Sequence, residues 1–337
     1  REPISYPADA STVSSTLGAL AGLSADRRLS VAEVDPAEYG LDSPAADITL
    51  SLADGSEVSF AVGDEMPLGS KRPIRIAGGE EIAVVPGWFM GDLERGVDDW
   101  RSREVADVRS GQVASIEIGA GEDTIHAVRV GDVWQLLSPV EDVADRDHLE
   151  GLFSDLGSLR IEEFLDGDVD PRALGLDAPE YSVMVVRSDG RDPLRLELGA
   201  TREGDGGTEV ACRRGDSDFF WALDRVRTRL SKAPVLWRSK KVSAFDTWEV
   251  EGLRLWTPEE SVELEKVDFQ WHFKGDGAEA DQTRVSDRIT ALSNLEATDY
   301  DLMAPISAEM GRAEIVMRAD DEGGERLELV LNFFARL

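Results

Sequence analysis

The sequence predicts an α+β fold made of a tandem repeat of about 136 residues, whose mostly antiparallel sheets are each covered by an Asp-capped amphipathic helix. Two observations lead to this prediction. An Ala-Asp pair opens the same helical pattern at Ala8, Ala144 and Ala280, in steps of 136 residues. Alternating strands with Asp-Gly turns, at Asp54 and Asp189, lie between the copies and are typical of antiparallel hairpins.

The helix of each repeat is predicted from its spacing of apolar residues. Apolar side chains stand 4, 8, 11 and 14 positions after the Asp, so they fall on one helical stripe. The Asp stands at the N-cap position, where its carboxylate can accept first-turn N–H groups. The stripes are Val13, Leu17, Leu20 and Leu23; Leu149, Phe153, Leu156 and Leu159; and Val285, Ile289, Leu292 and Leu295.

Other landmarks recur at nearly the same interval. Asp35-Pro36 with Tyr39-Gly40-Leu41-Asp42 matches Asp170-Pro171 with Leu174-Gly175-Leu176-Asp177. The further matches are Gly63 with Gly199, Ile76 with Cys212, Trp134 with Trp271, and Trp100-Arg101-Ser102 with Trp237-Arg238-Ser239.

One complete repeat is predicted to run from strands through the capped helix to a second group of strands. Strands joined by short turns form meanders, so the sheets should be mostly antiparallel. The predicted strands of the second repeat are 115–118, 124–130, 133–137, 161–164, 181–187, 194–198, 209–213 and 219–223, with a short helix near 224–230.

The repeat divides the chain into three predicted units, 1–105, 106–242 and 243–337. Unit one lacks the opening strands of the repeat, and unit three lacks its second half. The chain begins at Arg1 without a methionine, so we expect a processed fragment with an anchor or signal upstream.

Composition excludes several classes of protein. Lys and Arg number 36 and Asp and Glu 68, for a net charge of −32, which opposes binding to nucleic acid or to an anionic membrane surface. With 42% hydrophobic residues the chain can build cores. The single cysteine, Cys212, excludes an intramolecular disulfide or a multi-thiolate metal site. The acidity is compatible with adaptation to salt, with solubility alone, or with a basic partner.

Together the repeated features resemble the tandem-repeat bacterial proteins of domain-of-unknown-function family 4340. They are the strand with Trp134, the capped Leu-rich helix, the Gly-Leu-Asp-x-Pro turn, the Asp-Gly hairpin and the strand that ends in Gly. Unit three departs by losing the turn in 301–310. The resemblance implies genes beside gliding-motility-type ABC transporter genes, one N-terminal membrane helix and repeats outside the cytoplasm. It implies no catalytic residues.

The residues that most often carry chemistry give no recognisable constellation. His126, His148 and His272 do not recur between repeats and lack metal-ligand spacing, so we interpret them as partly exposed surface residues. Cys212 lies in an alternating strand and is predicted to pack as a small hydrophobe, although Arg213 and Arg214 follow it.

Three acidic residues form a weak calcium candidate. Asp166, Asp168 and Asp170 resemble the start of a calcium loop, but Pro171 and Asp177 stand where an EF-hand needs Gly and Glu. Weak cation binding stays open beside the alternative of a solvated acidic turn, in which Asp170 caps the turn at Pro171.

The recurring tryptophans are predicted to pack between adjacent repeats. Trp100, Trp237, Trp134 and Trp271 recur near unit boundaries, and burial explains recurrent aromatic residues better than a ligand-stacking pair does.

The sequence therefore predicts a non-enzymatic extracytoplasmic binding or scaffold protein without a cofactor. We expect an accessory subunit of a gliding-motility-type ABC transporter complex, with transporter components or other envelope proteins as partners and the membrane reached only through a segment upstream of Arg1. The alternative is a solute- or glycan-binding protein with a ligand cleft between repeats.

Overall fold

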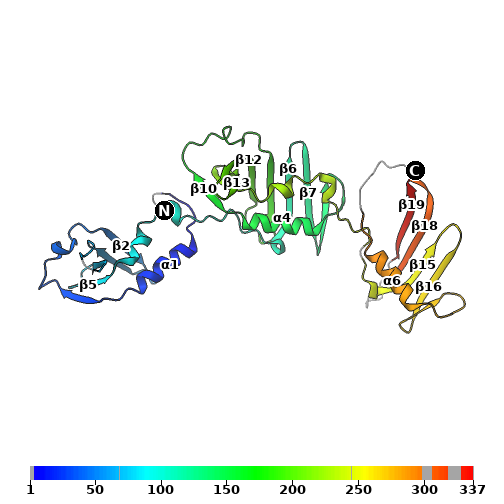
Figure 1. Cartoon of the computed structure of the whole chain (residues 1–337), viewed down its shortest axis with the longest axis horizontal. Coiled ribbons are helices and arrows are strands. Elements are labelled where there is room, and N and C mark those ends of the chain that lie inside the picture. Colours follow the sequence, from blue (N-terminus) through cyan, green and yellow to red (C-terminus); the bar gives the residue numbers. More distant parts are fainter. Residues whose placement is uncertain (1–3, 68, 244, 298–305, 318–327, 337) are drawn as a thin grey trace. The chain divides into compact units, whose positions relative to one another are not determined.

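The computed structural model describes residues 4–67, 69–243, 245–297, 306–317 and 328–336, which form three sheets. The sheets are mostly antiparallel, and the fold is α+β (Figure 1). The chain divides into two compact units, Arg1–Val105 with Arg160–Phe164, and Ala106–Leu159 with Leu165–Leu337. The division into three repeat units stays a prediction.

The first sheet has the strand order β1-β5-β4-β3-β2. Its register is set by tight turns such as the one at Gly55, which has a left-handed backbone. The elements are α1 (Ala10–Ala21), β1 (Arg27–Ser30), η1 (Pro36–Tyr39), β2 (Ala46–Ser51), β3 (Glu57–Val62), β4 (Lys71–Ile76), β5 (Glu81–Pro86), η2 (Gly87–Phe89), α2 (Met90–Leu93) and α3 (Val97–Trp100).

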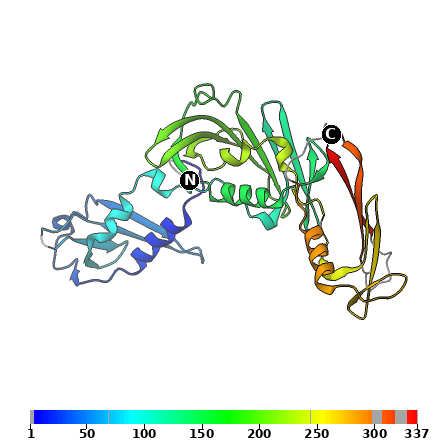
Figure 2. The ribbon, with the colours of Figure 1, turned by 45° about the vertical axis from the view of Figure 1, so that its right-hand side comes forward.

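Neighbouring strands of the second sheet follow the order β14-β13-β12-β11-β6-β7-β8-β9. The helix α4 lies against one face of it (Figures 1 and 2). The elements are η3 (Ser110–Gln112), β6 (Val113–Ala120), β7 (Asp123–Val130), β8 (Val133–Ser138), β9 (Asp142–Val143), α4 (Arg146–Ser158), β10 (Ile161–Leu165), β11 (Tyr181–Arg187), β12 (Leu194–Gly204), β13 (Gly207–Arg214), β14 (Asp218–Leu223), α5 (Arg227–Leu230) and η4 (Pro234–Trp237).

The third sheet has the order β17-β16-β15-β18-β19. Residues 301–305 of the stretch in which unit three was predicted to lose its turn lie outside the described residues. The elements are η5 (Thr247–Glu249), β15 (Val250–Trp256), β16 (Ser261–Val267), β17 (Gln270–Phe273), α6 (Gln282–Ser293), β18 (Ile306–Met317) and β19 (Glu328–Arg336).

The three long helices begin with the same side-chain cap. The carboxylates of Asp9, Asp145 and Asp281 each accept a hydrogen bond from the backbone N–H three residues later, at 2.7, 3.0 and 3.1 Å. An N-cap of this kind contributes about 1 kcal/mol, because it satisfies a donor that the helix leaves unpaired.

The apolar stripe is buried to different degrees in α4 and α1. Phe153 is fully buried, with its ring centroid 5.3 Å from that of Trp134 on β8. Leu17, which occupies the equivalent position in α1, is 47% exposed, contrary to the predicted buried stripe.

The Gly-Leu-Asp-x-Pro turn docks against a strand glycine, which directly follows β3 at Gly63 and lies at the register shift within β12 at Gly199. Gly40 and Gly175 both have a left-handed backbone, with φ of 68° and 67°. The preceding carbonyl then accepts an N–H from the residue after the strand glycine, from Asp64 to Tyr39 at 3.2 Å and from Ala200 to Leu174 at 2.8 Å. The turn therefore has a packing role in both repeats.

Each Trp-Arg-Ser segment pairs with the residues that precede a helix. Asp9 N–H donates to the Trp100 carbonyl at 2.8 Å, and Asp145 N–H donates to the Trp237 carbonyl at 2.7 Å. Directly after the second of these segments, the Lys240 carbonyl accepts a hydrogen bond from Ala297 N–H at 2.7 Å. This explains why the segment recurs, because its backbone positions the Asp cap of the helix.

Candidate functional site

The third sheet has one face covered by the helix α6, and among the residues that the structure describes no helix or strand covers its other face. The covered face packs Leu253, Leu264 and Trp271 against Val285 and Ile289 of α6. Side chains of a strand alternate between the two faces, so the neighbours of Leu253 and Leu264 in sequence point away from α6. We name this side the uncovered face, and define it by Gly252, Arg254, Trp256, Ser261, Glu263, Glu265, Arg312, Glu314 and Val316.

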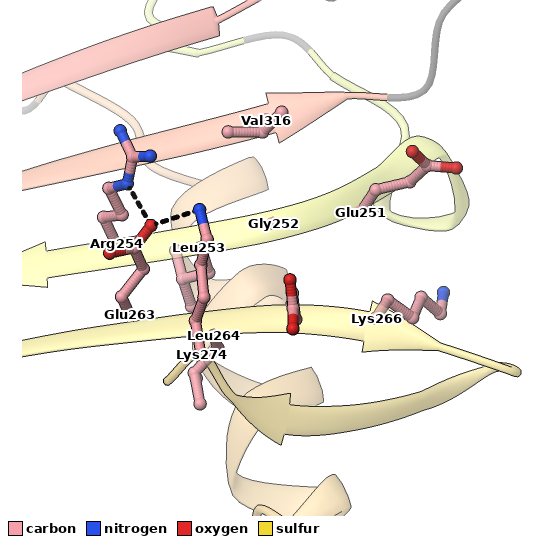
Figure 3. Close-up of a pocket in the computed structure, with 10 residues that line it drawn as sticks. Glu251, Gly252, Leu253, Arg254, Glu263, Leu264, Lys266, Lys274 and Val316 are labelled. Carbon is pink, nitrogen blue, oxygen red and sulfur yellow. Dashed lines mark hydrogen bonds and ion pairs between the residues drawn. The ribbon is translucent and has the colours of Figure 1, made fainter. Parts of the chain in front are cut away.

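A ladder of alternating charges crosses the middle of the uncovered face. Arg254 stands opposite Glu263 on one neighbouring strand and Glu314 on the other. Its guanidinium donates to Glu263 at 2.8 Å and to Glu314 at 3.0 Å. Lys274 Nζ donates to the same Glu263 oxygen at 2.7 Å, as Figure 3 shows. Charged partners on three strands, and Lys274 directly after a fourth, thus hold one another in fixed positions.

These pairs fix the protonation states of the ladder. Hydrogen bonds from Lys274 and Arg254 lower the pKa of Glu263, and hydrogen bonds to Glu263 and Glu314 raise the pKa of Arg254. A carboxylate with a lowered pKa is a poor proton donor near neutral pH. Glu263 is therefore held in its ionised form near neutral pH.

Two shallow depressions flank the ladder. One, of about 180 Å³, is lined by residues that include Gly252, Lys266 and Val316 (Figure 3). The other, of about 350 Å³, lies beside Trp256 and Arg312. The first sheet has a depression of its own, of about 530 Å³, which includes a hydrogen-bonded Thr49–Ser59 hydroxyl pair.

The predicted tryptophan set is buried to different degrees. Trp134 contacts Phe153, and Trp237 contacts His148 edge-on with ring centroids 4.5 Å apart, so both contacts lie within residues 106–242. Trp271 belongs to the core under α6, and Trp100 is partly exposed. The inter-repeat packing role of these four residues stays a prediction.

The acidic turn has the geometry of a capped turn at Asp170. Asp170 accepts a hydrogen bond from Arg172 N–H at 3.0 Å, as expected for a carboxylate that caps a turn. Among the residues that the structure describes, no group of three or more His, Cys, Asp or Glu side chains is arranged to hold a metal ion. The geometry gives no support to calcium binding by Asp166, Asp168 and Asp170.

Cys212 is fully buried, and its burial raises the pKa of its thiol, which confirms that it packs as a hydrophobe. The predicted match of Cys212 with Ile76 is wrong by two residues. Leu198 stands opposite Cys212, and Val62 stands opposite Ile74, so Ile74 is the structural counterpart. The chain from Leu198 to its partner Cys212 is longer than the chain from Val62 to Ile74, because β12 and β13 extend into a longer hairpin, and this shifts the sequence interval.

The surroundings of His148 predict a loss of stability in mild acid. Burial, and secondarily the charge of Lys232, lower the pKa of His148 below its ordinary value of 6.5, while Asp145 opposes them. The unfolded chain then binds the proton more tightly, so the free energy of unfolding should fall as pH drops below about 6.5 and stay unaffected well above it. Thermal unfolding of the protein and of His148→Phe, between about pH 8 and pH 5, measures this difference. Identical pH dependence in the two proteins would contradict it.

The residues of the uncovered face were not identified from the sequence. The available signal was the alternation of apolar and charged residues in Leu253-Arg254-Leu255 and Val262-Glu263-Leu264. The alternation shows that these charges leave the core, but the strand register is needed to show that they meet.

The fold is α+β, with antiparallel sheets and helices packed on them, and the third sheet carries the polar uncovered face. The family model described as "Domain of unknown function (DUF4340)" matches residues 1–179 and 134–309, so the chain belongs to this family. No curated protein and no solved structure matches the chain. Within the described ranges, no helix is both long and apolar enough to cross a membrane.

Proposed function

We propose that this chain is a non-catalytic, extracytoplasmic binding or scaffold protein built from three copies of one α+β unit. Its partner in this proposal is a gliding-motility-type ABC transporter complex in the membrane, of which it is an accessory subunit. A segment upstream of Arg1 anchors it. The observation that carries the proposal is the uncovered face of the third sheet, whose charged side chains are paired and fixed.

The repeated architecture supports a binding role. Two overlapping segments of the chain match the same family model, and Asp9, Asp145 and Asp281 cap equivalent helices. Proteins that repeat one structural unit use their extended surfaces for binding. The uncovered face offers side chains from three strands, β15, β16 and β18, and the paired charges among them have little freedom to rearrange, which lowers the entropic cost of association.

The class of partner is inferred from the family and from charge. The family resemblance implies neighbouring transporter genes and a location outside the cytoplasm. A net charge of −32 repels anionic lipid, so a protein partner suits the surface better than the bilayer itself.

Affinity purification of the full-length protein from detergent-solubilised native membranes, with mass spectrometry, tests the proposal. We expect a permease and its ATPase to be recovered. Arg254→Glu should reduce this recovery, because it breaks the charge ladder on the uncovered face. Arg284→Glu is the matched control, since the same charge change falls on a side chain of α6 that is 86% exposed. Recovery of no membrane protein, or equal loss in both variants, would overturn the proposal.

A further inference from the structure

We propose that Trp256 and the polar side chains around it form a binding site for a neutral saccharide. The site lies on the uncovered face of the third sheet, next to the charge ladder. The inference rests on the proposed binding function and deepens it by naming a class of ligand. It places that ligand on a sheet face within the third repeat rather than in a cleft between repeats.

Trp256 provides an aromatic surface at the end of β15. Its side chain is 43% exposed, and its neighbours across the sheet are Ser261 and Arg312. Arg312 Nε donates to Asn332 Oδ1 at 3.0 Å, which restrains the guanidinium on the strand next to β15. The depression of about 350 Å³ there falls within the range of small-ligand sites.

The charges that line this depression cancel. Arg254 and Arg312 stand with Glu263 and Glu314, two cations with two anions. A site without net charge has little attraction for an ion, but its fixed donors and acceptors can bond the hydroxyl groups of an uncharged ligand. An exposed indole face adds apolar contact area with a preferred geometry. A pyranose matches both features. Its hydroxyl groups suit the fixed donors and acceptors, and its C–H faces suit the exposed indole.

The second sheet provides an internal comparison. Its register places Thr124, Gly119 and Ser182 in one row across the sheet, where the third sheet has Ser261, Trp256 and Arg312. Gly119 thus occupies the position in the second sheet that Trp256 occupies in the third. The fold does not require a large exposed aromatic residue there, so Trp256 calls for a functional reason.

The next row differs in the same way. Glu117 of the second sheet stands between His126 and Met184, whereas Arg254 stands between Glu263 and Glu314. The combination of an aromatic surface with a neutral set of paired charges is thus a property of the third sheet and not of the second.

Isothermal titration calorimetry of the full chain with maltotriose, cellotriose and triacetylchitotriose tests the inference. We expect at least one of them to bind, and Trp256→Ala to weaken that binding about tenfold or more, through loss of stacking. Trp256→Phe should keep most of the affinity. Trp248→Ala is the matched control, because Trp248 is 62% exposed in the same repeat but lies in η5 and not on the uncovered face.

Unchanged thermal unfolding of Trp256→Ala would show that the variant is folded. Binding of none of the three saccharides, or equal binding by Trp256→Ala and the parent, would overturn the inference. So would a charged peptide that binds through Trp256 where the saccharides do not. Affinity purification separates the two proposals: recovery of a permease without saccharide binding contradicts only the saccharide site. Saccharide binding that depends on Trp256, without recovery of any membrane protein, contradicts only the transporter partner.

Discussion

Replacing Trp237 with alanine is expected to lower the free energy of unfolding by about 3 to 5 kcal/mol, the range typical for a buried aromatic side chain. Trp237 is 1% exposed, and its indole N–H donates to the Lys232 carbonyl at 3.1 Å. Its ring meets the edge of His148 on α4. Truncation would leave a cavity under that helix and an unpaired carbonyl at Lys232.

Urea unfolding of the full chain, followed by far-UV circular dichroism, measures the change in the free energy of unfolding. It is taken from the unfolding transition whose midpoint differs between the variant and the parent protein. Trp248→Ala is the control, because an exposed tryptophan should change stability by no more than about 0.5 kcal/mol. A near-zero effect at Trp237 would contradict its assignment to the core.

Replacing Gly199 with alanine is expected to lower the free energy of unfolding by about 3 kcal/mol, at the upper end of the usual cost of overpacking. A Cβ atom at this position would lie 2.2 Å from the Leu174 carbonyl oxygen, which is part of the docked turn. Relief would require the turn to move away, and the turn holds Leu176 against Ala211 and Trp221. The hydrogen bond from Ala200 to Leu174 would be lost with it.

Gly63→Ala should behave like Gly199→Ala, since its Cβ would lie 2.0 Å from the Tyr39 carbonyl oxygen. Gly111→Ala is the control, because nothing lies within 4 Å of a Cβ built there. Denaturant midpoints of the three variants test the role of the repeated turn. If Gly199→Ala were as stable as Gly111→Ala, the turn would not be docked as described.

The features that the sequence predicted well depend on local rules. The Asp caps, the left-handed glycines of the turn and the alternation of the strands each involve residues a few positions apart, so a short pattern contains the necessary information. The antiparallel sheets follow from the short connections between strands.

The features that were missed or misplaced depend on partners far along the chain. Arg254 meets Glu314 only because β15 pairs with β18 in one register, and sequence spacing does not reveal that register. Leu17 has the right spacing for a buried stripe but is 47% exposed, because helical spacing does not show what faces a residue. The shift from Ile76 to Ile74 arises from a connection of different length between equivalent strands.

The central claim is that the uncovered face of the third sheet binds the partner. Photo-crosslinking in native membranes tests it most directly, with benzoylphenylalanine in place of Glu265 on this face or of Arg284 on α6. The account predicts cross-links from position 265 to a transporter component and none from position 284. Cross-links from position 284 alone, or from neither position, would contradict it.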